Sequence, residues 1–148
     1  RPEMWVEPFA EAGATDFVFC RDTIEDFEGL VSLVSRRGLR LGVSLKIGED
    51  LDSLEGLWPH LNQVTIFGTE VGIKGVDMDP ATPEKVARAR RLIRERNLPV
   101  EIEVDGGIRR NTVPLLAEAG ADWIVPGSLL FQNDPSELRR WLDGLPTA

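Results

Sequence analysis

Five short apolar runs, each separated from the next by an amphipathic segment, constrain the fold of this chain more than any other feature. The runs cover residues 17–20, 41–45, 64–67, 100–104 and 123–125. Their length and spacing are typical of buried strands in βα units, whose strands lie parallel. The sequence therefore predicts an α/β protein with five parallel strands and intervening helices, in a single domain that spans residues 1–148.

The segments between the runs carry helix signals. Apolar residues recur at helical spacing over residues 5–12 and 24–34, and a glycine follows each of these segments. Thr23 is predicted to cap the second of the two helices. Further helices are predicted over 51–58, from Thr82 onward, over 111–119, and from the capping residue Asp134 onward.

Two architectures accommodate these units, and periodicity alone leaves both open. One is a doubly wound sheet, and the other is a (β/α)8 TIM barrel of about 250 residues, of which this chain would be a partial, later portion. The chain begins Arg1-Pro2-Glu3, and residues 4–9 read as a helix already under way, so we expect further chain upstream. As a barrel sector, the sheet would keep the strands in sequence order and leave two open edges, which favours association into a homo-oligomer.

The composition argues against several classes of function. The net charge of −8 disfavours a nucleic-acid partner, because phosphate backbones are bound by clustered cations, and the basic run at 88–96 reads as a solvated helix face. No apolar run approaches the roughly 20 residues that span a bilayer, so no membrane partner is predicted. The single cysteine, Cys20, excludes an internal disulfide and fits the reducing cytoplasm.

The residues that follow the fourth and fifth runs are candidates for a binding site. Ligands of parallel βα proteins bind at the carboxyl ends of the strands. Asp105 occupies such a position, and Gly106 and Gly107 after it would let a ligand approach the backbone closely. Gly127 and Ser128 follow the next strand, where backbone N–H groups bind phosphate well. An ordinary acidic βα turn explains Asp105 equally well, but two such turns in succession favour a phosphate site.

Other polar residues also follow strands. Lys46 and Lys74 are placed where an ammonium group would neutralise a phosphate or stabilise an enediolate, although each is more often a plain surface lysine. Asp22 and Glu70 are weaker acid–base candidates. His60 follows a proline near a helix end and reads as a surface residue rather than a metal ligand.

Three segments resemble the ribulose-phosphate 3-epimerase family. Residues 101–108, EIEVDGGI, are similar to its seventh strand, and residues 117–122, 125–128 and Phe131 continue the similarity through the eighth. Residues 5–14 resemble the helix after its third strand. The resemblance covers most of the chain, strongly at its end and loosely in its middle, and implies the C-terminal portion of a ribulose-phosphate-binding TIM barrel.

This resemblance implies an isomerase that interconverts ketopentose phosphates such as ribulose 5-phosphate and xylulose 5-phosphate. In that family two aspartates exchange the proton at C3 through an enediolate, and a divalent metal, commonly zinc, stabilises the oxyanion. The resemblance makes Asp105 one of these aspartates and a metal ligand, with the other ligands in strands before Arg1. It assigns the phosphate of a small sugar-phosphate substrate to Gly106, Gly107, Gly127, Ser128, Gly72 and Gly75.

Two segments depart from the family's pattern. Residues 20–22 replace its His-x-Glu, and residues 68–75 replace its Pro-Gly-Phe-Gly-Gly-Gln loop, so a different sugar phosphate is compatible with the sequence. The alternatives are a hexulose-phosphate synthase-like lyase, whose Asp-x-Lys-x-x-Asp pattern is missing, and a non-catalytic phosphate-binding domain. Because Asp105 is the one strong acid–base candidate, we expect the 148-residue chain alone to have little or no epimerase activity.

Overall fold

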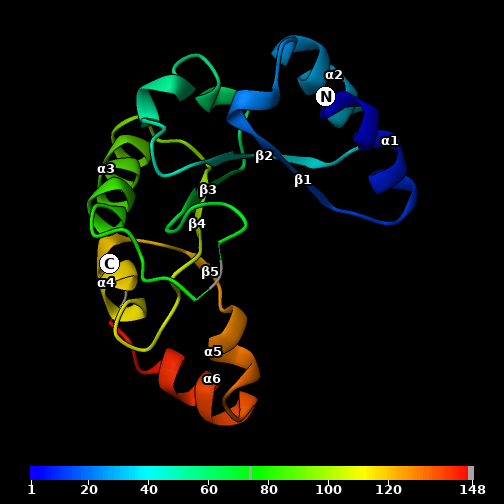
Figure 1. Cartoon of the computed structure of the whole chain (residues 1–148). Helices are drawn as coiled ribbons and strands as arrows, with labels where there is room; N and C mark the ends of the chain where they lie inside the picture. The colour runs from blue at the N-terminus through cyan, green and yellow to red at the C-terminus, as the bar shows by residue number, and fades with distance from the viewer. Residues whose placement is uncertain (74, 147–148) are drawn as a thin grey trace.

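A computed structural model describes residues 1–73 and 75–146, and these residues contain one five-stranded parallel sheet (Figure 1). The order of the strands in the sheet follows their order in the sequence, and each neighbouring pair is parallel. The sheet is therefore a sector of a (β/α)8 barrel and not a doubly wound sheet, in which the strand order reverses. The strands are β1 (Asp16–Cys20), β2 (Arg40–Leu45), β3 (Gln63–Phe67), β4 (Glu101–Asp105) and β5 (Trp123–Val125).

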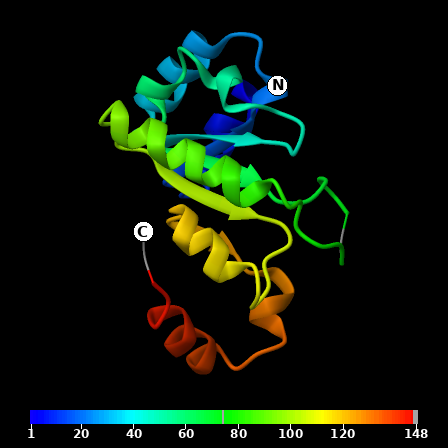
Figure 2. The ribbon, with the colours of Figure 1, turned by 90° about the vertical axis from the view of Figure 1, so that its left-hand side faces the viewer.

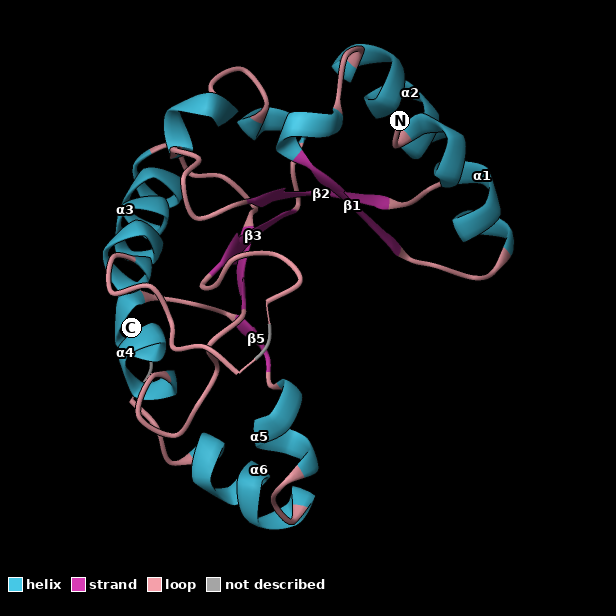
Figure 3. Cartoon of the chain, viewed as in Figure 1, coloured by secondary structure: helices cyan, strands magenta, loops and turns pink. Residues whose placement is uncertain are grey.

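Helices line the outer side of the curved sheet, and its inner side stays open in the described part of the chain (Figure 3). None of the helices in that part is long and apolar enough to cross a bilayer. The helices are α1 (Glu3–Glu11), α2 (Phe27–Arg36), α3 (Thr82–Glu95), α4 (Val113–Ala119), α5 (Gly127–Phe131) and α6 (Pro135–Asp143). Three 3₁₀ turns accompany them: η1 (Arg21–Thr23), η2 (Leu51–Leu54) and η3 (Trp58–His60).

Alternation along β4 separates apolar residues on the outer face of the sheet from acidic residues on its inner face. On β4, Ile102 and Val104 are fully buried in the core, whereas Glu101, Glu103 and Asp105 alternate with them and are only partly buried. Successive side chains of a strand point to opposite faces, so the three carboxylates share one face. Because helices cover the apolar face, the carboxylates lie on the open inner side of the sheet.

Polar contacts hold the inner face near the amino ends of the strands. Arg40 of β2 forms ion pairs with Asp16 of β1, at 3.3 Å between Nε and Oδ1, and with Glu101 of β4. Closer to the carboxyl ends of the strands, the hydroxyl of Thr65 on β3 donates a hydrogen bond of 2.9 Å to Glu103 Oε1 on β4. Two of the three carboxylates of β4 are thus engaged, and Asp105 is the one nearest the carboxyl end.

The sequence prediction of the helix from Thr23 misplaced its first residue. Thr23 lies in η1, where its hydroxyl donates a 2.7 Å hydrogen bond to the carbonyl of Cys20. The helix begins four residues later, and Asp26 caps it by accepting a 2.9 Å hydrogen bond from the backbone N–H of Gly29. Aspartate and threonine both cap helix N-termini with a side-chain oxygen, so the prediction gave the right kind of cap at the wrong residue.

One further local prediction is wrong. The helix predicted over 51–58 is replaced by η2 and η3, because Gly56 between them has a φ of +83° and breaks the helical path. The segment 127–128 follows β5, and its strand-to-helix turn leads directly into the short helix α5.

Candidate active site

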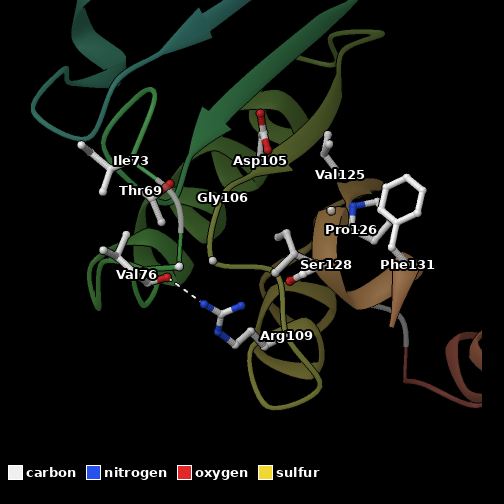
Figure 4. Close-up of a pocket in the computed structure, with 14 residues that line it drawn as sticks. Thr69, Ile73, Val76, Asp105, Gly106, Arg109, Val125, Pro126, Ser128 and Phe131 are labelled. Carbon is white, nitrogen blue, oxygen red and sulfur yellow. Dashed lines mark hydrogen bonds between the residues drawn. The ribbon is translucent and has the colours of Figure 1, made fainter. Parts of the chain in front are cut away.

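A cavity of about 450 Å³ lies at the carboxyl ends of β3, β4 and β5 (Figure 4). Its walls come from the loop after β3, the glycine turn after β4 and the start of α5. Among the residues predicted from the sequence, the cavity brings together Asp105, Gly106, Gly107, Gly127, Ser128 and Gly75. Gly72 is not among the lining residues. The two turns that were expected to be neighbours therefore do meet at one site.

Asp105 is the one carboxylate that lines this cavity within the described residues. Its side chain is half-buried, and this burial raises the pKa of the carboxyl above its ordinary value, while a hydrogen bond from the backbone of Gly106 acts in the opposite direction. A carboxyl whose pKa is moved toward neutrality exchanges its proton more readily at physiological pH. Asp105 is thus suited to act as an acid or a base.

The turn after β4 packs directly against the loop after β3, and glycine is what permits this contact. Gly106 has a φ of +96°, and a Cβ atom there would lie 2.3 Å from Thr69 Oγ1. Gly107 has a φ of +68°, and a Cβ atom there would lie 2.5 to 2.7 Å from the Cβ, Cα and N atoms of Met78. Neither the backbone conformation nor the space accommodates a side chain at Gly107.

We expect Gly107→Ala to lower the free energy of unfolding by about 1–2 kcal/mol, the cost of holding a non-glycine residue in the left-handed region. The contact with Met78 would also displace the loop that walls the cavity. Urea denaturation followed by circular dichroism measures the first effect, and amide NMR shifts over residues 76–79 measure the second. Gly48→Ala is the matched control, since Gly48 has open space around it and an ordinary φ. Equal stability of the two variants would contradict the prediction.

The loop 68–79 is anchored at both ends, and residues 70–73 and 75–77 within it are exposed. The N–H of Gly68 donates to the carbonyl of Asp105 and the N–H of Asp79 donates to the carbonyl of Gly68, each at 2.7 Å. Figure 2 shows the loop projecting beyond the strand ends. Ile73 and Val76 line the cavity, whereas Glu70 is exposed and does not. Lys74 lies outside the described residues.

The start of α5 supplies the wall opposite this loop. The first N–H groups of a helix have no intrahelical acceptor, so those of Gly127 and Ser128 are available to an anionic ligand. Phe131, at the other end of α5, also lines the cavity and is 88% exposed. The site can therefore hold an anion between two turns and present an apolar rim to solvent.

Sequence reasoning missed Arg109, which also lines the cavity. Its backbone N–H donates a 2.9 Å hydrogen bond to the hydroxyl of Thr112, which in turn donates at 2.9 Å to the carbonyl of Gly107. These bonds fix the path of the turn from the glycine to the arginine. The sequence feature that could have indicated Arg109 is its position two residues after Gly107, within the same turn.

Three residues considered from the sequence lie away from the cavity. Lys46 and Asp22 form an ion pair, which lowers the pKa of the Asp22 carboxyl and raises the pKa of the Lys46 ammonium. Neither residue lines the cavity. His60 packs edge-on against Phe27, with 5.8 Å between the ring centroids. Of the candidates Asp22, His60 and Asp105, only Asp105 lies in the candidate active site.

The ligand set of a metal centre is incomplete in this part of the chain. Residues 1–73 and 75–146 contain no group of three or more His, Cys, Asp or Glu side chains that could hold a metal ion. A structural or catalytic zinc takes three or four protein ligands. The donors described here therefore do not by themselves fit a divalent metal at the mouth of the sheet.

Comparison with protein families gives one match that covers most of the chain. The model described as "Ribulose-phosphate 3 epimerase family" matches residues 1–131. Proteins named ribulose-phosphate 3-epimerase are 31% identical in Mycobacterium tuberculosis and 35% identical in Candida glabrata, over 90% and 93% of this chain. A cytoplasmic isoform from Oryza sativa subsp. japonica is 34% identical over 97% of the chain. The chain spans 58%, 54% and 65% of these three relatives, respectively.

Solved structures match the fold. A double mutant of flavocytochrome b2 with pyruvate bound superimposes with a TM-score of 0.58 at 18% identity, over 82% of this chain and 37% of that chain. A second structure of flavocytochrome b2, with sulfite bound, gives a TM-score of 0.57 at the same identity. At this identity the likeness concerns the arrangement of strands and helices alone.

Proposed function

Because this chain belongs to the ribulose-phosphate 3-epimerase family, we propose that it supplies the substrate-binding part of an epimerase acting on ketopentose phosphates. The proposed reaction interconverts substrates such as ribulose 5-phosphate and xylulose 5-phosphate by moving the proton at C3. We further propose that residues 1–148 form one domain, the later portion of a ribulose-phosphate-binding barrel. The open inner face of the sheet and the share of the relatives' length that the chain spans support this proposal.

The observation that carries the proposal is the meeting of one carboxylate with two phosphate-type turns in a single cavity. Asp105 lies at one end of the cavity, and Ser128 lies toward the other end. A sugar phosphate has a matching layout, because its reacting carbon lies at some distance from its dianionic phosphate group. The cavity of about 450 Å³ falls within the usual range for small-molecule sites.

Within this arrangement Asp105 would transfer the proton at C3. As a carboxylate it would accept the proton from one face of the carbon, leaving an enediolate, and in the reverse direction it would return the proton to that face. Inversion needs a second group on the opposite face, and the cavity contains no other acid among the described residues. We therefore propose that Asp105 performs one of the two proton transfers.

The proposal for a metal is limited to one ligand. By similarity to the family, Asp105 would contribute to a divalent ion that stabilises the oxyanion of the enediolate when it is bound. The chain's described donors do not complete such a site, so the remaining ligands would have to come from outside them. The steps above depend only on Asp105 and the backbone of the two turns.

A phosphate site without turnover is the second candidate for the 148-residue chain taken alone. The specific observation in its favour is the single carboxylate in the cavity among the described residues. One acid–base group allows a ligand to bind, but epimerisation with inversion requires two. The binding site is therefore the part of the proposal that this chain can test directly.

We expect phosphate to shift the amide NMR signals of Gly106, Gly107, Gly127 and Ser128 before any others. The reason is that anions accept hydrogen bonds from backbone N–H groups at strand-to-helix turns. The measurement is a titration of the ¹⁵N-labelled chain with inorganic phosphate, and with ribulose 5-phosphate in a second series. The amide of Gly48, which does not line the cavity, is the internal control. Shifts confined to residues outside the cavity would overturn the assignment.

A further inference from the structure

We propose that Arg109 is a specificity-determining residue that binds the phosphate group of the substrate from the side of the cavity opposite Asp105. The inference rests on the proposed function, since it names the cation of the same site. Figure 4 shows Asp105 and Arg109 at opposite ends of the cavity, with Gly106 and Ser128 between them. A ligand that puts its reacting carbon near Asp105 would extend its phosphate toward the guanidinium.

The charge around the cavity favours a local cation. The chain carries a net charge of −8, and the site contains the carboxylate of Asp105, so a phosphate dianion entering it meets a repulsive field. Backbone N–H groups contribute only partial charges. Among residues 1–73 and 75–146, Arg109 is the one cationic side chain that lines the cavity. Its guanidinium therefore supplies the full positive charge that the turns lack.

The guanidinium of Arg109 has donors to spare. Within the part of the chain that the structure describes, it donates one hydrogen bond, of 3.0 Å, to the carbonyl of Val76. Its contact with Asp77 is long, at 3.8 Å between Nε and Oδ1, and the Asp77 side chain is 100% exposed. An ion pair with a fully exposed carboxylate contributes little, and an arginine has five N–H donors in a planar fork that suits phosphate oxygens. A phosphate can thus replace Asp77 as the partner of Arg109 without leaving a buried charge unpaired.

The backbone holds Arg109 in place before any ligand arrives. Thr112, which is 9% exposed, accepts a hydrogen bond from the Arg109 N–H and donates one to the carbonyl of Gly107. The arginine and the glycine turn are therefore parts of one rigid segment. A phosphate bound by the N–H groups of this turn has the side chain of Arg109 on the same segment, within the same cavity.

Arg110 provides a matched control one residue away. Its guanidinium donates a 3.1 Å hydrogen bond to Asn133 Oδ1 and lies 4.9 Å from the centroid of the Trp141 ring. It does not line the cavity. Arg109→Gln and Arg110→Gln remove the same charge from neighbouring positions, so comparing them separates a contact in the site from a change in overall charge.

The test is a titration of the 148-residue chain and its variants with inorganic phosphate and with ribulose 5-phosphate, followed by amide NMR. Ribulose without a phosphate group is the third ligand. We expect Arg109→Gln to weaken binding of both phosphate ligands about 10- to 100-fold, the loss of a hydrogen bond to a charged group. Arg109→Lys should bind with intermediate strength, because it keeps the charge and loses the fork. Arg110→Gln should bind as the unchanged chain does, and ribulose should distinguish none of the four.

Each contrary result has a different meaning. Equal phosphate affinity of Arg109→Gln and the unchanged chain, with the glycine amides still shifting, would overturn the role of Arg109 and leave the proposed function standing. That role would be overturned equally if Arg109→Gln only shifts the amides of 75–79, since the residue would then merely hold the loop. Equal weakening by Arg110→Gln would show a non-specific charge effect and also overturn it. If the unchanged chain binds no phosphate, both the inference and the proposed function are wrong.

Discussion

Replacement of Asp105 by asparagine is expected to slow exchange of the C3 proton of ribulose 5-phosphate by about 10²- to 10⁴-fold, the usual contribution of one acid–base catalyst. Asparagine keeps the shape of the side chain but cannot transfer a proton. The structure gives the reason for the large effect, since Asp105 is the one carboxylate in the cavity among the described residues. The measurement is deuterium incorporation at C3 in D₂O, in a polypeptide that contains this sequence and catalyses the exchange.

Asp22→Asn is the matched control for this experiment. Asp22 also follows a strand, but it is exposed, paired with Lys46 and absent from the lining of the cavity. We expect its replacement to leave the exchange rate within about twofold. Full activity of Asp105→Asn would refute the proposed mechanism. A loss in Asp22→Asn as large as in Asp105→Asn would show that the second proton-transfer group had been misplaced.

The pH dependence of exchange gives an independent check. Burial raises the pKa of the Asp105 carboxyl, so this group keeps its proton up to a higher pH than an exposed aspartate does. Removal of the C3 proton requires the carboxylate, and the rate should therefore fall as the pH drops through this raised pKa. We expect the acid limb of the rate profile above the range of an ordinary aspartate. An acid limb at or below that range would contradict the assignment.

Replacement of Trp58 by alanine is expected to lower the free energy of unfolding by about 3–5 kcal/mol. Trp58 lies in η3, is 1% exposed and belongs to the core between the helices and the sheet. Its removal would leave a cavity that the surrounding side chains cannot fill completely. A loss of this size is a large part of the roughly 5–15 kcal/mol that stabilise a typical domain. Urea denaturation followed by circular dichroism measures it.

Trp58→Phe distinguishes packing from polarity in the same experiment. The indole N–H of Trp58 is buried and has no hydrogen-bond partner within the described part of the chain. Phenylalanine removes this unsatisfied donor and keeps most of the apolar contact, so the two effects offset each other. We expect a cost well below that of alanine. If phenylalanine proves as costly as alanine, the indole N–H has a partner that the described residues do not reveal.

The parallel direction of the strands was predictable from local pattern, whereas their order, which distinguishes a barrel sector from a doubly wound sheet, was expected only through the barrel reading. The five apolar runs that predict β1 to β5 are separated by amphipathic segments, and βα units of this kind are joined in parallel. The helix α5 was not predictable in the same way. It is one turn long and begins at Gly127, a residue with low helix propensity, so tertiary packing of Leu129 rather than local preference accounts for it.

The candidate site was predictable only where it follows strand ends. Asp105 and the glycines beside it were found because the carboxyl end of β4 fixes their place in the fold. The path of the loop 68–79 was not, because it depends on the contact of Met78 with Gly107, which are far apart in sequence. That path places Gly75 at the cavity and Gly72 away from it. Arg109 was missed for the same reason, because its place in the cavity depends on the path of this loop, which forms the facing wall.

The carboxylates on the inner face of β4 differ in their surroundings between the two ends of the strand. Arg40 binds Glu101 and lowers the pKa of its carboxyl, so this group resists protonation and its ion pair persists in mild acid. Asp105, two side chains further along the same face, has the opposite tendency, and its raised pKa reflects burial rather than a charged partner. Among residues 1–73 and 75–146, taking up a proton at Asp105 would therefore break no ion pair between the strands. A catalytic group placed in this way can change its charge in every turnover while the framework that positions it stays the same.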